Sequence, residues 1–208
     1  MNIICVKFGT KYGPEFVNKL FTDLNRCDNF YCYTDDSNGL DKGITVIPDM
    51  GRPTLKVWWN KLRMFDKNFP LSGKTLFIDL DVKINSPLEL KFPLYACWNK
   101  ITFIDSHWKQ GKLYNRLSNY DVKMNSSMIA WDADNPEVHK IWDHFNTGFR
   151  DYYLRKYKGI DRFIVHEDFE YDTFAHEYIQ SKKYQPDIDY DPIIITFEEL
   201  PVAIKDLI

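Results

Sequence analysis

The sequence predicts an α/β protein with a mixed, mainly parallel central sheet flanked by helices. Three observations indicate this fold class. Short apolar segments alternate with segments whose apolar residues recur every three or four positions, as strands and helices do. Proline and glycine clusters separate the segments. Small, polar or acidic residues follow several predicted strands, at the edge where open parallel sheets bind ligands.

In the first ninety residues, a strand and helix alternation is predicted from the N-terminus. Strands are expected at residues 3–8, 29–34, 44–47 and 74–82. The first helix follows Pro14 and carries Phe16, Val17, Leu20, Phe21 and Leu24 on one face. The second has Thr54 as its predicted N-cap and carries Leu55, Trp58, Trp59, Leu62 and Phe65. At least one of the two tryptophans is expected to be buried, and stacking of the other on a sugar is the alternative to a second buried ring.

The second half is less regular. Strands are expected at residues 94–98, 101–104, 124–131 and 193–197. Pro136 opens a helix with Val138, Ile141, Trp142 and Phe145 on its apolar face, and residues 152–178 are expected to be mostly helical. We find no internal repeat or linker, so residues 1–208 are predicted to form one domain.

The composition excludes several classes of function. A formal net charge of −3 argues against a nucleic-acid binder that relies on a basic face. No stretch of 18 apolar residues predicts a membrane span, and the first strand begins at once, without a targeting segment. The four cysteines form no CxxC pair, which favours buried thiols over disulfides or a metal cluster. A cytoplasmic protein is the resulting expectation.

The acidic pair Asp79 and Asp81 is the most informative feature of the chain. On an extended strand, side chains two apart point the same way, roughly 6.6 Å apart. At an effective dielectric of about 20, two negative charges at that distance repel by roughly 2.5 kcal/mol. A divalent cation would remove that cost and keep positions open for a bound ligand. The alternative is that both aspartates cap a strand or turn.

Three strand ends bring polar groups to the same predicted edge: residues 9–12, residues 35–36 and residues 79–81. Gly9 permits close approach of a ligand to the backbone, and Tyr12 offers a ring that can stack on a base. Asp35 or Asp36 can accept hydrogen bonds from a ribose or base. The alternative for each is a turn residue with no ligand.

These segments together resemble the metal-dependent glycosyltransferases of the GT-A (nucleotide-diphospho-sugar transferase) fold, most of all the family-8, glycogenin-like and galactosyltransferase-like branch with its viral and bacterial relatives. The resemblance covers about the first two-thirds of the chain. The matching pieces are residues 6–12, 33–36, 59–62, 76–82 and 124–132.

The resemblance implies roles for individual residues. Asp79 and Asp81 would bind Mn²⁺ or Mg²⁺ and, through it, the donor diphosphate, with Leu80 between them. Lys61 would lie near the diphosphate, while Asn125 and Asp161 would contact the transferred sugar. The nucleoside would be held by Phe8, Gly9, Thr10, Lys11, Tyr12, Asp35 and Asp36. The donor would be a nucleotide sugar, with a UDP-sugar favoured, and the acceptor a glycan, a protein or a small molecule. Residues 1–90 would then form the nucleotide and metal half, and residues 91–208 the sugar and acceptor half.

The chain also departs from that pattern. Family-8 enzymes often use a C-terminal histidine as a third metal ligand, and residues 195–201 contain none. Glu198 is the residue we expect to replace it. Two other functions stay open: a nucleotidyltransferase that makes a sugar nucleotide, and a degenerate module that binds nucleotides or glycans without catalysis. The first generally needs a glycine-rich, basic loop after the first strand, where this chain offers only Lys11.

Overall fold

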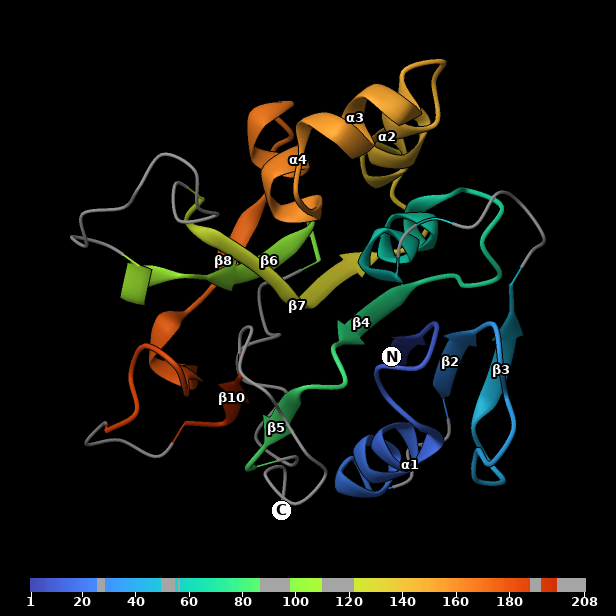
Figure 1. The fold of residues 1–208 in the computed structure, drawn as a ribbon. Coiled ribbons are helices and arrows are strands. Elements are labelled where there is room, and N and C mark those ends of the chain that lie inside the picture. Colours follow the sequence, from blue (N-terminus) through green and yellow to red (C-terminus); the bar gives the residue numbers. More distant parts are fainter. Residues whose placement is uncertain are drawn as a thin grey trace.

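The computed structural model describes residues 1–25, 29–49, 55, 57–86, 98–109, 122–187 and 192–197. Its central sheet has seven strands in the order β3-β2-β1-β4-β7-β6-β8 (Figure 1). Their bounds are β1 Asn2–Lys7, β2 Phe30–Thr34, β3 Thr45–Pro48, β4 Lys74–Ile78, β6 Thr102–Asp105, β7 Met124–Asp132 and β8 Asp172–Phe174. Strands β3, β2, β1 and β4 are mutually parallel, β7 is antiparallel to both β4 and β6, and β8 is parallel to β6. The predicted mixed, mainly parallel sheet is confirmed.

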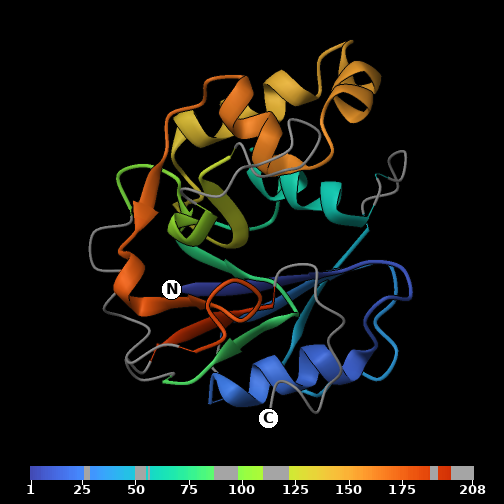
Figure 2. The same cartoon turned by 60° about the vertical axis from the view of Figure 1, so that its left-hand side comes forward.

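Helices cover both faces of this sheet (Figures 1 and 2). Helix α1 lies on one face, and the 3-10 helix η1 lies with α2, α3 and α4 on the other. Their bounds are α1 Pro14–Asp23, η1 Val57–Phe65, α2 Pro136–Phe145, α3 Arg150–Lys156 and α4 Ile160–His166, with the short 3-10 helices η3 His107–Lys109 and η5 His176–Tyr178. No helix within the described residues is long and apolar enough to cross a membrane.

The alternation of side chains along each strand explains why two cores form. Because successive residues of a strand point to opposite faces, a strand buried on both faces feeds two clusters. In β4, Leu76 and Ile78 join the core beside α1, whereas Phe77 joins the core beneath η1 and α2. Met128 and Ile129 of β7 divide in the same way.

Of the three predicted amphipathic helices, α1 and α2 begin and pack as expected. The third is the 3-10 helix η1, and the prediction is wrong for Trp58, which is 50% exposed rather than on the buried face. Pro14 and Pro136 occupy the first turns of α1 and α2, where the missing N–H removes no hydrogen bond. Asn135 caps α2 by accepting a hydrogen bond from the Glu137 backbone N–H at 3.0 Å. All the residues named for the apolar faces of α1 and α2 are buried.

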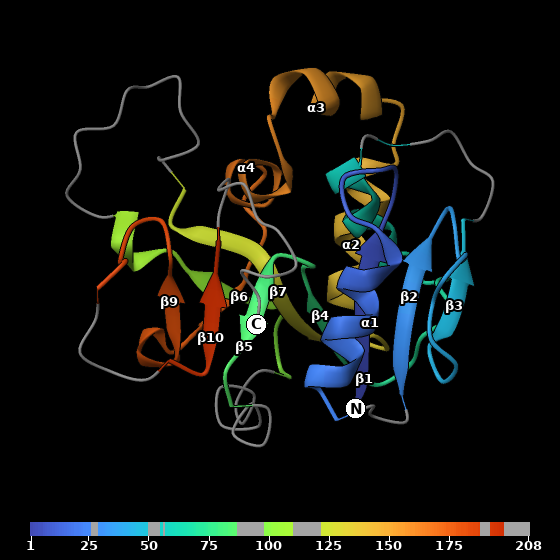
Figure 3. The same ribbon diagram turned by 60° about the horizontal axis from the view of Figure 1, so that its bottom comes forward.

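A second, three-stranded sheet was not predicted. It has the order β5-β10-β9, with bounds β5 Val82–Ile84, β9 Ile179–Ser181 and β10 Ile194–Thr196 (Figure 3). The predicted last strand therefore exists, but it pairs with β5 and β9 rather than with the central sheet. The prediction that residues 152–178 are mostly helical is correct for α3 and α4 and wrong beyond them, because Asp172–Phe174 extends the sheet as β8.

Some predictions fall on residues outside the described ranges. They are Thr54 as a helix cap, the strand at residues 94–98 apart from its last residue, Glu198 as a metal ligand, and the cysteines Cys27 and Cys97. Cys5 and Cys32 are buried free thiols, as expected of thiols on neighbouring inner strands.

Candidate active site

The acidic pair lies at the carboxyl end of β4, at the start of the connection to β5. The pair does not continue the strand: β4 ends at Ile78, and the Val82 N–H donates to the Asp79 carbonyl at 3.3 Å, which closes a turn. The extended geometry assumed from the sequence is therefore wrong. Leu80, 3% exposed, belongs to the core beside α1. Asp79 and Asp81 nevertheless line one cavity, so the turn places both carboxylates at the same site, as was expected of an extended strand.

Asp79 is held by a buried lysine. Lys61 Nζ lies 2.6 Å from Asp79 Oδ2, and the two side chains are 11% and 21% exposed. The ammonium group also lies 4.9 Å from the Phe77 ring centroid and 3.4 Å from the Ser126 carbonyl oxygen. The pKa of Asp79 is raised to about 6: burial raises it most, the Lys61 cation opposes the rise, and the charges of Asp81 and Asp161 add to it.

Asp81 is bound by the loop that follows β1. The Tyr12 hydroxyl donates to Asp81 Oδ2 at 2.8 Å, and Lys11 Nζ lies 3.9 Å from the same oxygen. Burial and the Asp81 charge raise the pKa of Tyr12, so the phenol stays protonated and acts as a donor. Lys11 Nζ lies 4.5 Å from the Tyr12 ring centroid. The first loop and the acidic pair, 69 residues apart, thus form one unit.

The space between these groups is a cavity of about 130 Å³, which we call the aspartate cavity. It is lined by Val6, Lys7, Phe8, Lys11, Tyr12, Trp58, Lys61, Asp79, Leu80 and Asp81. The sequence had named seven of these residues for donor or metal binding. Val6 and Lys7 were missed as binding residues, and Trp58 was considered only in the alternative that one of the two tryptophans stacks on a sugar.

The remaining nucleoside-binding candidates lie together but outside that cavity's lining. The Gly9 N–H donates to Asp35 Oδ2 at 3.0 Å, and Gly9 has a φ of +68°, which a residue with a side chain rarely adopts. Asp36 Oδ1 accepts from the Asn38 backbone at 3.0 Å and from its side chain at 2.7 Å. Gly9, Thr10, Asp35 and Asp36 are all exposed. Nucleoside binding by these four residues stays a prediction.

A second cavity, of about 320 Å³, adjoins the first, and we call it the Asp161 cavity. It is lined by Trp58, Lys61, Ser126, Lys158, Gly159, Ile160, Asp161 and Arg162. Trp58 and Lys61 line both cavities. Asp161, in the first turn of α4, lines this cavity, and its charge is the smallest of the contributions that raise the pKa of Asp79; its contact with a sugar stays a prediction.

Asn125, the other predicted sugar contact, is 9% exposed and lies on β7. Its Oδ1 accepts a hydrogen bond from the Ser127 N–H at 2.8 Å, and the Ser127 carbonyl accepts one from the Asp79 N–H at 2.8 Å. Asn125 does not line either cavity, whereas its neighbour Ser126 lines the Asp161 cavity. The structure therefore links Asn125 to the turn that carries Asp79, and a direct contact with sugar stays a prediction.

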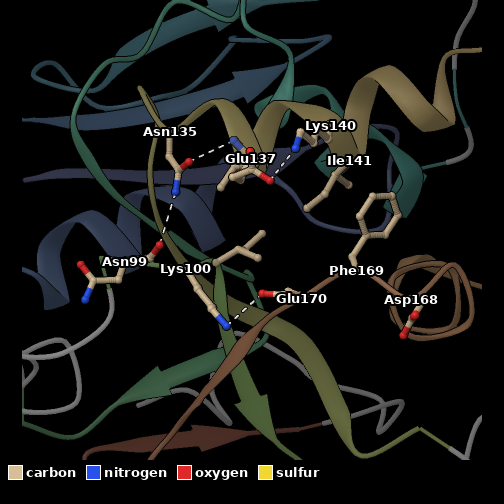
Figure 4. Close-up of a pocket in the computed structure, with 11 residues that line it drawn as sticks. Asn99, Lys100, Asn135, Glu137, Lys140, Ile141, Asp168, Phe169 and Glu170 are labelled. Carbon is tan, nitrogen blue, oxygen red and sulfur yellow. Dashed lines mark hydrogen bonds and ion pairs between the residues drawn. The ribbon is translucent and has the colours of Figure 1, made fainter.

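A third cavity, of about 360 Å³, lies at the far end of β7 (Figure 4). Four of its five charged side chains form ion pairs, Lys100 with Glu170 at 3.0 Å and Lys140 with Glu137 at 2.6 Å, and the fifth, Asp168, is exposed. Asn135 Nδ2 donates to the Asn99 carbonyl at 3.4 Å. Because most of its polar side chains already bind one another, we assign no ligand to this cavity.

Comparison with known proteins identifies the fold. No protein-family model and no curated protein matches the sequence. The structure, however, is similar to that of the galactosyltransferase LgtC, which was solved in complex with donor and acceptor sugar analogues. The TM-score is 0.63 and the sequence identity 11%, over 95% of this chain and 87% of LgtC. The chain has a GT-A glycosyltransferase fold. Two further glycosyltransferases agree with this assignment.

GlyE of Streptococcus pneumoniae TIGR4 has a TM-score of 0.65 at 13% identity, over 97% of this chain and 57% of GlyE. A glycosyltransferase involved in glycosylation of the major capsid of PBCV-1 has a TM-score of 0.55 at 11% identity, over 96% of this chain and 95% of that one. The GT-A resemblance found in the sequence is thus confirmed at the level of the fold.

Asp79 and Asp81 have the ligand chemistry that a divalent cation needs. Hard cations such as Mn²⁺ and Mg²⁺ take carboxylate oxygens, and Asp79 and Asp81 supply two carboxylates to one cavity. Within the described ranges, the contacts of both carboxylates run through Oδ2, which leaves Oδ1 for another ligand. No cluster of three or more His, Cys, Asp or Glu occurs in the described part of the chain. The pair therefore fits a cation that takes its other ligands from a bound diphosphate or water.

Proposed function

We propose that this protein transfers a sugar from a nucleotide-diphospho-sugar, with a UDP-sugar favoured, to an acceptor that is a glycan, a protein or a small molecule. The observation that carries the proposal is the convergence of Asp79, Asp81, Lys61 and Tyr12 on one cavity of a GT-A fold. The cavity lies beyond the carboxyl end of β4, the edge at which open α/β sheets bind ligands.

The charges of the aspartate cavity suit a diphosphate leaving group. Breaking the anomeric C–O bond of a nucleotide sugar places new negative charge on the diphosphate and positive character on the sugar ring. Asp79 and Asp81 would hold Mn²⁺ or Mg²⁺, which supplies Lewis-acid stabilisation of the leaving group when it is bound. Lys61, fixed by Asp79 and Ser126, provides a second positive centre that needs no reorganisation.

The residues around the Asp161 cavity suit the sugar side of the reaction. The Asp161 carboxylate offers hydrogen-bond acceptors for sugar hydroxyls and a negative charge near the developing positive charge. Asn125 orients the turn that carries Asp79 through Ser127. Positioning and electrostatics are sufficient for such a good leaving group, so no dedicated nucleophile is required.

The experiment that tests the proposal is a donor-hydrolysis screen. The protein is incubated with common nucleotide sugars and Mn²⁺, and nucleotide release is measured without an acceptor. We expect release from one donor class, and we expect the change D79N or D81N to lower it at least a hundredfold, in the range found when one transition-state charge partner is removed. D66N, in an exposed turn bound to Asn68, is the matched control and should change release little.

Two further measurements separate the alternatives. Calorimetric titration of UDP with and without Mn²⁺ should give Mn²⁺-dependent binding that D79N abolishes. Binding without any turnover would favour the degenerate module. Turnover of a nucleoside triphosphate with a sugar phosphate, but not of any nucleotide sugar, would favour the nucleotidyltransferase and refute the proposal.

A further inference from the structure

Two adjacent tryptophans on η1 have opposite environments. Trp59 is 1% exposed and stacks on Phe145 with ring centroids 5.3 Å apart, so it belongs to the core. Trp58 is 50% exposed. A single exposed apolar side chain is common at protein surfaces, so exposure alone assigns Trp58 no role, and its surroundings have to decide.

Trp58 lies at the junction of the two adjoining cavities. It lines both the aspartate cavity and the Asp161 cavity, and Lys61 is the other residue that lines both. Lys61 is already bound to Asp79. The exposed aromatic surface at this junction therefore comes from Trp58.

The chemistry of the Asp161 cavity suits a sugar ring. A pyranose has an apolar face of C–H groups and an edge of hydroxyls, so a site that binds it needs an aromatic surface together with polar groups. Trp58 provides the surface, while Ser126 and Asp161 provide oxygen acceptors. A volume of about 320 Å³ lies within the range of small-ligand sites.

We propose that Trp58 is the platform on which a sugar ring of the acceptor stacks. This inference rests on the proposed function. The diphosphate would occupy the aspartate cavity, so the anomeric carbon of the donor would lie near the junction. An acceptor then has to approach from the Asp161 cavity, and Trp58 is the exposed aromatic that borders that route. The ligand class is a glycan or glycoside, and the contact sets acceptor affinity rather than the chemical step.

The first test measures how the donor sugar divides between a glycoside and water. The probes are the methyl glycosides of glucose, galactose, mannose, N-acetylglucosamine, xylose and rhamnose, each supplied with the donor found by the hydrolysis screen. Stacking worth about 1 kcal/mol corresponds to about a fivefold change in affinity. We expect W58A to raise the half-saturating glycoside concentration about fivefold and to lower the ratio of transfer to hydrolysis, while W58F retains most of both.

The matched control is F149A, which removes another exposed aromatic, 65% exposed and outside the lining of both cavities. It should leave the ratio of transfer to hydrolysis unchanged. If W58A and F149A have equal effects, or if W58A lowers transfer and hydrolysis in the same proportion, Trp58 does not hold the acceptor and the inference is overturned.

The second test does not depend on turnover. The protein is labelled with 5-fluorotryptophan, the Trp58 resonance is assigned from its loss in W58F, and the glycosides are titrated in the presence of UDP and Mn²⁺. A saturable shift of the Trp58 resonance supports the inference, and a resonance that none of the six glycosides moves overturns it. If the wild-type protein releases nucleotide from no donor, the proposed function fails, while this titration still decides whether Trp58 binds sugar.

Discussion

Replacing Glu167 with Gln should destabilise the helical layer that carries Asp161. Glu167 follows α4 and accepts contacts from three side chains. Lys156 Nζ of α3 lies 3.1 Å from Oε1, His144 Nε2 of α2 lies 2.9 Å from Oε2, and the Tyr157 hydroxyl donates to Oε1. One carboxylate thus joins three helices, and E167Q removes its charge while nearly keeping its shape.

The size of the effect follows from the pKa. Burial opposes ionisation, but the hydrogen bonds from Tyr157, His144 and Lys156 outweigh it and lower the pKa of Glu167 from 4.5 to about 2. A lowered pKa means that the ionised form stabilises the fold above the unfolded pKa, and that this contribution is lost as the pH falls through the folded pKa. The full shift corresponds to about 3 kcal/mol at pH 7. Solvent screening of the partly exposed partners reduces our expectation to about 2 kcal/mol.

Urea unfolding of the wild type and E167Q checks this value. We expect E167Q to be less stable by about 2 kcal/mol at pH 7, and the difference to be roughly 40% smaller at pH 3.5. E170Q is the control, since Glu170 pairs with Lys100 at the surface with its side chain 82% exposed, and should cost less than about 0.5 kcal/mol. A cost for E167Q that equals that of E170Q, or that does not change with pH, would refute the reasoning.

Three further predictions concern the site and its support. K61M removes the cation beside the buried Asp79 and should lower the free energy of unfolding at pH 7 by about 3 kcal/mol. The control K11M changes a side chain that is 65% exposed and should lower it by less than about 0.5 kcal/mol. Urea unfolding of both variants measures the two costs, and equal costs would contradict the prediction. W59A should cost about 3–5 kcal/mol in the same assay because it leaves a cavity in the core, and W58A little; a large cost for W58A would mean that Trp58 supports the fold. Burial raises the pKa of Cys5, so iodoacetamide followed by peptide mass spectrometry should modify Cys5 only after unfolding, and rapid labelling of the native protein would disprove its burial.

The parts of the fold that could be predicted from sequence are those that local pattern specifies. Strand β1 was predicted because its apolar residues are contiguous, and helix α2 because a first-turn proline and helically spaced apolar residues lie within one short segment. The three-stranded sheet was missed because it depends on pairing Ile194 with Ile84, 110 residues earlier. Strand β8 was missed because its three residues follow a charged helical segment and gain their strand conformation from pairing with β6.

In the candidate site, too, short sequence patterns predicted some residues, while contacts between distant residues were not predicted. The acidic pair was named from its own motif and Lys61 and Asp161 from the family resemblance, and the structure places them on adjoining cavities. The hydrogen bond from Tyr12 to Asp81 joins residues 69 positions apart, and no local signal indicates it. Helical spacing placed both Trp58 and Trp59 on the apolar face, and only the structure shows that Trp59 is buried while Trp58 is half exposed. The sequence could not predict that the Asp161 cavity lies beside the exposed Trp58.

Glu167 and Asp79 are two carboxylates whose pKa values are shifted in opposite directions. Glu167 has a lowered pKa, so its ionised form stabilises the folded protein at pH 7. Asp79 has a pKa raised from 3.8 to about 6, so at pH 7 its ionised form costs the fold about 3 kcal/mol, and the cost disappears as the pH falls towards the unfolded pKa. A group that only had to stabilise the fold would not be kept where its charge is unfavourable, even beside Lys61. Under the proposed function, a cation bound at Asp79 and Asp81 would offset this cost, whereas Glu167 already has its partners in the fold; the prediction is therefore that a cation binds at Asp79 rather than at Glu167.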